Sequence, residues 1–379
     1  MPRVSASMPS LAIVNASDRT DGITQSVEPF ADALAHRGFA VRWYQCLDHG
    51  AEPRVPPGGV RVAGLGVPWR TLDMGVNRLW TFPRALADLR ADYVLLADPT
   101  LTRIAPAGAR VAVYVHDLRP LSPFSDRYAT RLMYRHAVAR LHGAWRLLVS
   151  TRVVAEQLAR LGLDPERVRV VPETHGLGLH PEHPGRSAAR IAEEEEIRVL
   201  YVGTDRPYKN LGLVLELAAR LARATRPRFS FTLLSRLRPA SLRRIAAQRL
   251  TGVRVISEVE SVGAVYDAHD VVVFPSRYEG FGRPLIEAMA YGLPILASRI
   301  STTEEVAGDA AILLDPDRPD EWQRALLALG EPASLATAAQ RSLARGPAYL
   351  PEPFDRAVER AFAETPVPAD GPGSAAPFR

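Results

Sequence analysis

Short apolar runs alternate with helix-like segments along this chain, and the rhythm stops once and then restarts. Runs such as 92-DYVLLA-97 and 110-RVAVYV-115 lack regular polar–apolar alternation, which is typical of strands buried on both faces. Strands that alternate with helices form parallel sheets covered by helices. The sequence therefore predicts an α/β fold of two doubly wound, Rossmann-like domains facing across a cleft, where a ligand would meet the strand ends.

The same patterns predict individual elements. In the first half we expect strands at 11–16, 40–45, 92–97, 110–115, 146–150 and 168–172, and helices at 25–37, 79–90, 125–142 and 152–161. In the second half we expect strands at 197–203, 229–235, 253–257, 271–276, 294–298 and 311–315. The helices expected there are 209–223, 239–250, 261–268, 284–291, 302–307 and 319–329, followed by 333–344 and 353–364.

The interruption lies in 173-ETHGLGLHPEHPGRSAARIAEEEE-196, which has Pro, Gly and His residues and then four consecutive glutamates. We interpret it as a linker. The predicted divisions are an N-terminal domain at 1–178, the linker at 179–196, a C-terminal domain at 197–345, a helix within 346–364 and a tail at 365–379. The tail is rich in Pro, Gly and Ala, a composition that predicts disorder.

Composition limits the partners and the compartment. The net charge of +5 and the pI of about 9.5 suit an anionic partner, which could be a nucleotide, a phospholipid surface or a nucleic acid. Cys46 is the only cysteine, so no intrachain disulfide or cysteine-based metal cluster can form, and a reducing, cytoplasmic location is expected. Without a signal-like start or an apolar run of about 18 residues, we expect any membrane contact to be peripheral.

The richest stretch is 274-FPSRYEGFGRPLIEAMAYGLPILAS-298, in which a buried strand leads into a helix near Pro284. Gly280-Phe281-Gly282 follows Glu279 and would let backbone N–H groups approach a ligand, beside a helix N-terminus that favours an anion. Glu287, one turn into the helix, could accept hydrogen bonds from a diol. The alternative is a simple tight turn with a solvated or capping carboxylate, and the residues alone leave both open.

In this setting, Glu279 and Glu287 resemble the Glu-x7-Glu signature of retaining glycosyltransferase family 4, and 303-TEEVAGDAAILLDPDRPDEW-322 is similar to the family's next segment. The resemblance implies the GT-B fold, with a nucleotide sugar on the C-terminal domain and the acceptor on the N-terminal domain. It implies that Glu287 binds the donor ribose and that Glu279 lies beside the donor sugar and diphosphate. Gly280 and the amides of Phe281 and Gly282 would line them, and the helix in 346–364 would cross back to the N-terminal domain.

Lys209 is the only lysine among 47 basic residues, and we expect it to begin the helix after the strand that ends at Gly203-Thr204. There its ammonium could face the anion that a helix N-terminus favours. The resemblance includes a similar "G-R…KN" element, whose Lys and Arg hold the diphosphate. Thr204 replaces that arginine, and Arg206 is the available substitute. The alternative for Lys209 is a surface lysine without a role.

The N-terminal half offers fewer candidates. His116 and Asp117 end a predicted strand, and the resemblance implies that His116 orients the donor sugar while Asp117 steadies the loop or faces the acceptor. A packed or surface histidine is the commoner alternative. Gly22 is what remains, in 15-NASDRTDGITQS-26, of the family's glycine-rich diphosphate loop. The chain has no GxGxxG or Walker motif, which removes the usual support for a dinucleotide or P-loop site.

Two further patterns bear on metal and membrane. Asp315-Pro316-Asp317 is formally Asp-x-Asp, but it closes a predicted strand, so no metal is expected; Lys209, Arg206 and a helix dipole would take that role. Arg127, Arg131 and Arg135 share a helix face that could rest on anionic lipid, although a solvated face is the simpler interpretation.

The sequence thus predicts a retaining, metal-independent hexosyltransferase without a cofactor. The donor would be a nucleotide diphosphate sugar, with GDP or UDP and mannose or glucose favoured. The acceptor would be a glycan or a lipid-linked glycan in cell-surface polysaccharide or glycolipid synthesis, at the inner face of the membrane. A nucleotide-sugar 2-epimerase, a sugar phosphorylase and a non-catalytic nucleotide-sugar-binding subunit are the alternatives. Nucleic-acid binding lacks both basic–aromatic clusters and a recognisable module.

Overall fold

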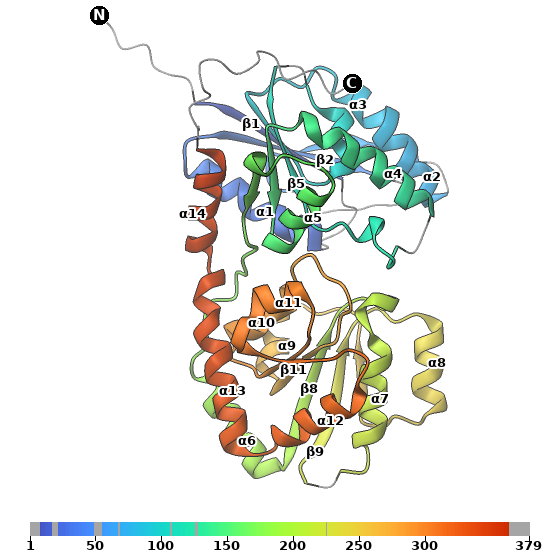
Figure 1. Ribbon diagram of the computed structural model, residues 1–379, viewed down its shortest axis with the longest axis vertical. Helices are drawn as coiled ribbons and strands as arrows, with labels where there is room; N and C mark the ends of the chain where they lie inside the picture. The colour runs from blue at the N-terminus through green and yellow to red at the C-terminus, as the bar shows by residue number, and fades with distance from the viewer. Residues whose placement is uncertain are drawn as a thin grey trace, which may run out of the picture. The chain divides into compact units, whose positions relative to one another are not determined.

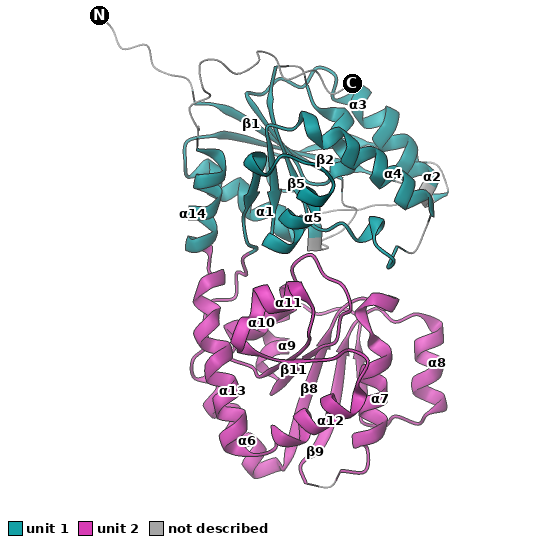
Figure 2. Cartoon of the chain, viewed as in Figure 1, with its two compact units in different colours: residues 1–173, 352–379 teal, residues 174–351 magenta. Residues whose placement is uncertain are grey.

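The computed structural model divides the chain into two compact units, shown in Figure 2. Unit 1 comprises residues 1–173 and 352–379, and unit 2 comprises residues 174–351. The structure describes residues 8–16, 22–48, 55–66, 69–106, 108–125, 128–224 and 226–363. The predicted tail at 365–379 lies outside the described residues.

Unit 1 contains a seven-stranded parallel sheet in the order β3-β2-β1-β4-β5-β6-β7. Its strands are β1 (Ser10–Asn15), β2 (Ala40–Leu47), β3 (Val60–Ala63), β4 (Tyr93–Leu96), β5 (Arg110–Val115), β6 (Arg146–Val149) and β7 (Val168–Val170). Strands β1, β4, β5 and β6 are almost entirely buried, as their unbroken apolar runs predict. The strand order reverses direction between β1 and β4, which places the topological switch point there.

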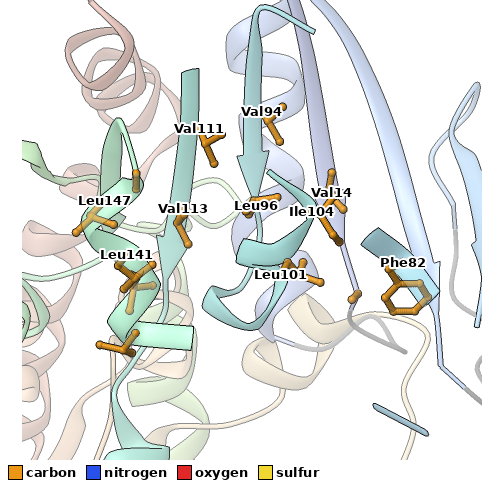
Figure 3. Packing of buried hydrophobic residues seen from close by; sticks show 14 of the residues in the cluster. Val14, Phe82, Val94, Leu96, Leu101, Ile104, Val111, Val113, Leu141 and Leu147 are labelled. Atoms are coloured by element: carbon orange, nitrogen blue, oxygen red, sulfur yellow. The ribbon is translucent and has the colours of Figure 1, made fainter. Parts of the chain in front are cut away.

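Helices cover both faces of this sheet. They are α1 (Gly22–Ala35), α2 (Arg70–Val76), the π-helix η1 (Asn77–Thr81), α3 (Phe82–Ala85), α4 (Tyr128–Ala139), α5 (Arg152–Arg160) and α14 (Pro351–Phe362), with 3₁₀ turns η2 (Pro99–Ile104), η3 (Arg119–Leu121), η4 (Arg140–Gly143) and η5 (Pro165–Arg167). Val14, Val94 and Val113 from the sheet pack with Phe82 and Leu141 in one core, shown in Figure 3.

Unit 2 contains a six-stranded parallel sheet in the order β10-β9-β8-β11-β12-β13. Its strands are β8 (Glu196–Val202), β9 (Arg228–Leu234), β10 (Val253–Ile256), β11 (Val271–Phe274), β12 (Ile295–Ser298) and β13 (Ala311–Leu314). Here the switch point lies between β8 and β11. Both sheets confirm the predicted doubly wound α/β architecture.

The helices of unit 2 form two layers, with α9, α10 and α11 over one face of the sheet and α7, α8 and α12 over the other (Figure 1). They are α6 (His183–Glu194), α7 (Leu211–Leu221), α8 (Pro239–Ala247), α9 (Val262–Asp267), α10 (Arg283–Ala290), α11 (Ser301–Ala307), α12 (Pro319–Ala328) and α13 (Pro332–Arg345), with 3₁₀ turns η6 (Pro207–Lys209), η7 (Gly308–Ala310) and η8 (Gly346–Tyr349). A separate apolar core fills each side of the sheet.

The predicted linker at 179–196 is part of unit 2 and contains α6. Ala188 and Ile191 from this helix pack against the core of unit 2. On the same buried side, the Ser187 hydroxyl donates to the Asp270 carboxylate at 2.8 Å. The run of glutamates suggested a solvated connection, but the residues before it supply one apolar helical stripe, and that stripe is buried.

The chain passes between the units twice, after Glu173 and after Pro351. At the edge of unit 2 these two connections are joined, because the Tyr349 carbonyl accepts from the Thr174 hydroxyl at 2.8 Å and from the His175 N–H at 3.3 Å. The Tyr349 hydroxyl in turn donates to the Val306 carbonyl at 2.6 Å. After the second connection, α14 packs its apolar residues against the core of unit 1 that contains Leu11, Ile13 and Phe30.

Candidate functional site

The loops that follow β8, β11 and β13 are hydrogen-bonded to one another at the carboxyl ends of these strands. The Arg277 N–H donates to the Tyr208 carbonyl at 2.7 Å, which joins the loops after the two strands that flank the switch point. The Asn210 side chain donates to the Pro316 carbonyl at 3.1 Å, and the Thr302 hydroxyl to the Glu279 carbonyl at 2.9 Å. These bonds fix the loops at the position where doubly wound sheets bind ligands.

Lys209 and Glu279, predicted separately as site residues, form an ion pair in this loop cluster. The Lys209 ammonium lies 2.6 Å from a Glu279 carboxylate oxygen, and their side chains are only 15% and 9% exposed. The ammonium also lies 5.6 Å from the ring centroids of Tyr208 and Phe274. A charge pair held mostly out of water acts more strongly on a bound anion than an exposed pair would.

The local backbone around Lys209 differs from the sequence expectation. Lys209 ends η6 instead of beginning a helix, because Asn210 adopts the left-handed conformation with φ +53° and α7 begins at Leu211. Lys209 therefore does not share an anion site with the first turn of a long helix. Its position depends on the bonds between the loops.

Gly282 makes the turn between the Glu279 loop and α10. Its φ of +102° suits glycine, and an added Cβ would lie 3.1 Å from both Phe274 and Leu285. The buried Phe281 ring packs edge-on against Tyr349, with 5.8 Å between ring centroids. Gly280 is buried as well. The Gly-Phe-Gly segment is thus held by packing on one side and by a glycine-specific turn on the other.

Glu287 is a buried carboxylate on α10, with 9% of its surface exposed. The Tyr266 hydroxyl donates to one of its oxygens at 2.8 Å, and the Arg283 guanidinium lies 3.6 Å from the other. Burial, followed by the charge of Glu287, raises the pKa of Tyr266 well above its usual value, so the phenol remains a donor. The oxygen that faces Arg283 keeps acceptor capacity for a ligand hydroxyl.

Sequence reasoning missed Tyr266 and Arg283. The i, i+4 spacing of Arg283 and Glu287 could have indicated the arginine, since such pairs meet on a helix surface. Tyr266 lies on α9, in another part of the sequence, and no local pattern indicates its contact with Glu287.

Arg206 is exposed, and its backbone N–H donates to the Thr204 carbonyl at 2.8 Å. The structure brings it to the same loop as Lys209 through η6. The assignment of Arg206 to a diphosphate remains a prediction.

The carboxylates of the Asp-x-Asp pattern, Asp315 and Asp317, contact other groups of the protein. The Asp315 carboxylate accepts from the Asp317 N–H at 2.8 Å, and the Asp317 carboxylate pairs with Arg277. Within the described residues, no group of three or more His, Cys, Asp or Glu side chains is arranged to hold a metal ion. The two aspartates therefore stabilise the loop after β13 in this structure.

His116 follows β5 in unit 1. Burial lowers its pKa to about 4, against smaller opposing effects from the Asp98 charge and a hydrogen bond to the Ala97 backbone. The ring is therefore neutral at pH 7. Its Nε2 is buried and has no hydrogen-bond partner among the residues that the structure describes. A neutral imidazole with one nitrogen bonded to a backbone carbonyl can accept a hydrogen bond at the other.

Of the remaining predicted residues of unit 1, Gly22 lies after β1 and Asp117 lies beside His116 after β5. Gly22 is the first residue of α1, while residues 17–21 of the preceding loop lie outside the described residues. The Asp117 carboxylate accepts from the Arg119 N–H at 2.9 Å, and the Tyr134 hydroxyl donates to the Asp117 carbonyl at 2.9 Å. Asp117 thus steadies its own loop, which was one of its two predicted roles.

Comparison with known proteins identifies the family. The model described as glycosyl transferases group 1 matches residues 196–331, and the model described as a glycosyl transferase 4-like domain matches residues 21–174. Together they span most of both units. The chain belongs to the group 1 glycosyltransferases. This assignment confirms the family resemblance seen in the Glu-x7-Glu segment.

Curated relatives of this chain include the D-inositol 3-phosphate glycosyltransferase of Rhodococcus opacus, 33% identical over 51% of this chain and 47% of the relative. The MMP alpha-(1->4)-mannosyltransferase of Mycolicibacterium hassiacum is 30% identical over 63% of this chain and 62% of the relative. The match thus spans about half to two thirds of the relatives' length.

Solved structures establish the GT-B fold of this chain. Sucrose-phosphate synthase from Thermosynechococcus elongatus has a TM-score of 0.77 at 19% identity, covering 93% of this chain and 98% of that chain. Anabaena HepE in complex with UDP and glucose has a TM-score of 0.73 at 14% identity, with coverage of 93% and 98%. None of the described helices is long and apolar enough to cross a membrane.

Proposed function

We propose that this glycosyltransferase moves a hexose, with retention of anomeric configuration, from a nucleotide diphosphate sugar to a glycan or lipid-linked acceptor in cell-surface polysaccharide or glycolipid synthesis. The arrangement of Lys209, Glu279 and Glu287 at the switch point of unit 2 carries the proposal. Ligands of doubly wound sheets bind at this position. The three side chains offer the charges and acceptors that a nucleotide sugar requires.

In this proposal, Glu287 accepts hydrogen bonds from the ribose hydroxyls through the oxygen that Tyr266 does not occupy. Lys209 exchanges part of its contact with Glu279 for the diphosphate, with Arg206 as its partner. The amides of Phe281 and Gly282, together with Gly280, line the sugar and the diphosphate, and Gly22 contributes a backbone N–H from unit 1. His116 accepts a hydrogen bond from a sugar hydroxyl through Nε2.

The proposed transfer reaction depends on the position of the Lys209 ammonium relative to the leaving diphosphate. Negative charge develops on the leaving diphosphate as the glycosidic bond breaks, and a prearranged ammonium stabilises it. The leaving phosphate then helps to deprotonate the acceptor hydroxyl that attacks from the same face, which retains the configuration. Because Lys209 gains most from this developing charge, its loss slows chemistry more than binding.

Two findings support the choice of donor. The relatives include mannosyltransferases, and the similar fold of Anabaena HepE is recorded with UDP and glucose. We therefore favour mannose or glucose carried by GDP or UDP. A cytoplasmic enzyme at the inner face of the membrane, in peripheral contact with anionic lipid, fits a lipid-linked acceptor.

A thermal-shift panel of UDP-, GDP-, ADP- and dTDP-sugars tests the proposal, because a ligand that binds only the folded state raises the melting temperature. We expect one nucleotide class to raise the melting temperature when it is added at about millimolar concentration. That concentration is roughly 100 times a dissociation constant of tens of micromolar. Absence of stabilisation by every donor would contradict the transferase assignment.

Metal independence is part of the same proposal, since Lys209 and Arg206 take the position of a cation beside the diphosphate. We expect EDTA to leave turnover unchanged with the donor identified in the panel. Loss of turnover that Mg²⁺ or Mn²⁺ restores would instead assign the Asp315 and Asp317 carboxylates to a metal.

A further inference from the structure

Unit 1 exposes two tryptophans. Trp69 and Trp80 are 72% and 56% exposed, whereas Trp43 and Trp322 are buried and Trp145 is half-buried. Tryptophan is costly to leave in water because of its large apolar surface. Exposed aromatic residues that cluster therefore mark an interaction surface more often than isolated exposed apolar residues do.

The two tryptophans belong to an apolar stripe on consecutive helices. Trp69 precedes α2, Leu72 lies within it, and Leu79 and Trp80 lie on the π-helix η1. Leu72 is 50% exposed and Leu79 is 37% exposed. All four side chains are thus exposed along one continuous segment, residues 69–80.

Helix α4 contributes to the same region, because it packs beside α2 (Figure 1). Its residues Tyr128 and Leu132 are 81% and 58% exposed. Arg131 and Arg135 are exposed at the intervening positions of the same face, whereas Tyr134, Ala137 and Val138 are buried on the other. We call the surface formed by Trp69, Leu72, Leu79, Trp80, Tyr128 and Leu132 the aromatic face.

The charges around the aromatic face are positive. Across residues 69–86 and 128–143 the sequence has one acidic residue, Asp73, which is buried and accepts from the Asn77 side chain at 2.9 Å. The Arg84 guanidinium lies 4.7 Å from the centroid of the Trp80 ring. Burial, followed by the charges of Arg103 and Arg140, lowers the pKa of His136 on α4. Part of this lowering therefore comes from neighbouring arginines.

We propose that the aromatic face docks unit 1 onto an anionic phospholipid surface. Tryptophan, tyrosine and arginine together suit the boundary between lipid headgroups and acyl chains. Each arginine near an anionic surface strengthens binding by roughly fivefold, and the apolar side chains add to this by burial. A soluble acidic protein would match the charge, but it would not require two exposed tryptophans beside four exposed aliphatic or phenolic side chains.

This inference specifies the peripheral contact within the proposed function, but it is tested without donor or acceptor. The full-length protein is mixed with vesicles of phosphatidylcholine alone, or of phosphatidylcholine with about 30 mol% phosphatidylglycerol, and binding is measured by flotation. About 0.1 M and about 1 M salt are compared, because screening shortens the reach of charges from about 10 Å to about 3 Å. Tryptophan fluorescence is recorded in parallel.

We expect binding to the anionic vesicles to exceed binding to phosphatidylcholine at least tenfold, to weaken in high salt, and to shift tryptophan emission to the blue. The double variant Trp69→Ser/Trp80→Ser should bind at least tenfold more weakly and lose the blue shift. Arg131→Glu/Arg135→Glu should lose binding to a similar degree. All four side chains are exposed, so melting temperature and the thermal shift given by the nucleotide sugar should not change.

The matched control is Leu242→Ser/Arg243→Glu on α8 of unit 2, where an exposed leucine and an exposed arginine are also adjacent. It should bind vesicles as the natural chain does.

The proposal is overturned if the natural chain does not bind anionic vesicles, if the variants of the aromatic face bind normally, or if the control loses binding equally. A dimer that forms without vesicles and dissociates in the tryptophan variant would assign the face to a second copy instead. A failed donor panel with normal vesicle binding would leave this inference standing.

Discussion

Units 1 and 2 share a strand order around their switch points, yet the side chains predicted to contact the donor differ in charge between the two units. In unit 2 the groups are ionic, with Lys209 paired to Glu279 and Glu287 held between Tyr266 and Arg283. In unit 1, His116 is neutral at pH 7 and its Nε2 has no partner among the described residues. The difference suggests a division of labour, in which unit 2 holds the charged part of a donor and unit 1 orients hydroxyl groups.

Replacement of Lys209 tests the ionic side of this comparison and should have the largest effect. Lys209→Ala should lower kcat by roughly 10²–10³ while changing donor affinity less, because the ammonium acts on charge that develops during the reaction. Lys209→Arg, which keeps the charge in another geometry, should retain part of the rate. Steady-state kinetics with the donor from the thermal-shift panel measure both parameters. Undiminished turnover in the alanine variant would contradict the role.

The same residue also stabilises the fold, and a double variant separates the two effects. Lys209→Ala leaves the Glu279 carboxylate mostly buried without its cation, which should lower the melting temperature. Adding Glu279→Gln removes the unpaired charge, so stability should recover while turnover stays low. Recovery of turnover together with stability would show that the pair is only structural.

Glu287 tests whether unit 2 binds the nucleotide. Glu287→Gln should weaken binding of both the nucleotide sugar and the free nucleoside diphosphate by about 30-fold, or about 2 kcal/mol, as expected for hydrogen bonds to a charged acceptor. Tyr266→Phe removes one donor to the same carboxylate and should cost less, about 1 kcal/mol. Calorimetric titration measures both. A largely exposed carboxylate is a suitable control, and Glu352→Gln on α14, whose side chain is 81% exposed, offers one.

Acid should destabilise both units for the same reason. Burial is the first cause that lowers the pKa of His116 to about 4 in unit 1 and of His175 to about 4 in unit 2. The unfolded chain then binds protons near pH 6.5 while the folded chain does not, so the free energy of unfolding falls as the pH drops from about 6.5 to about 4. We expect up to about 3 kcal/mol from each residue, and no contribution above pH 6.5.

Denaturant titrations at several pH values of the natural chain, His116→Gln and His175→Gln isolate these contributions from those of the carboxylates. Each variant should show a shallower loss of stability across this window. Identical slopes in all three proteins would show that neither histidine is held neutral by the fold.

Replacement of His116 should have the smallest of these effects on catalysis, and it should distinguish the roles of the two units most clearly. His116→Phe removes an acceptor for a sugar hydroxyl, so the affinity for the nucleotide sugar should fall about tenfold, or about 1.4 kcal/mol. The affinity for the free nucleoside diphosphate should not change, in contrast to Glu287→Gln. Equal losses for both ligands would remove the distinction between the two units.

The sequence predicts the sheets well because their strands are buried. Continuous apolar runs predicted six of the seven strands in unit 1 and all six in unit 2 to within about two residues. The missed strand β3 (Val60–Ala63) is short and mostly exposed at the sheet edge, and it follows Pro and Gly residues, so it carries little of the pattern. The π-helix η1 was missed as well, since local sequence does not distinguish it from an α-helix.

The site is a different case, because its residues meet across long stretches of chain. Strand-end position and family resemblance pointed to Lys209 and Glu279 one at a time, but the two lie 70 residues apart and their direct contact depends on the neighbouring positions of β8 and β11. A 3-2-1-4 strand order would reveal the switch point, but the strand order is itself a feature of the tertiary structure and cannot be read from the sequence. Sequence therefore supplies the chemical groups, while pairing of the strands decides which of them meet.

The bonds between Thr174, His175 and Tyr349 join the two connections to one another. Both segments are hydrogen-bonded to one carbonyl, that of Tyr349, at the edge of unit 2. The Arg283 guanidinium donates to the Thr174 carbonyl at 3.1 Å and also faces Glu287. One side chain of α10 therefore contacts both the joined connections and the carboxylate that is predicted to bind the ribose.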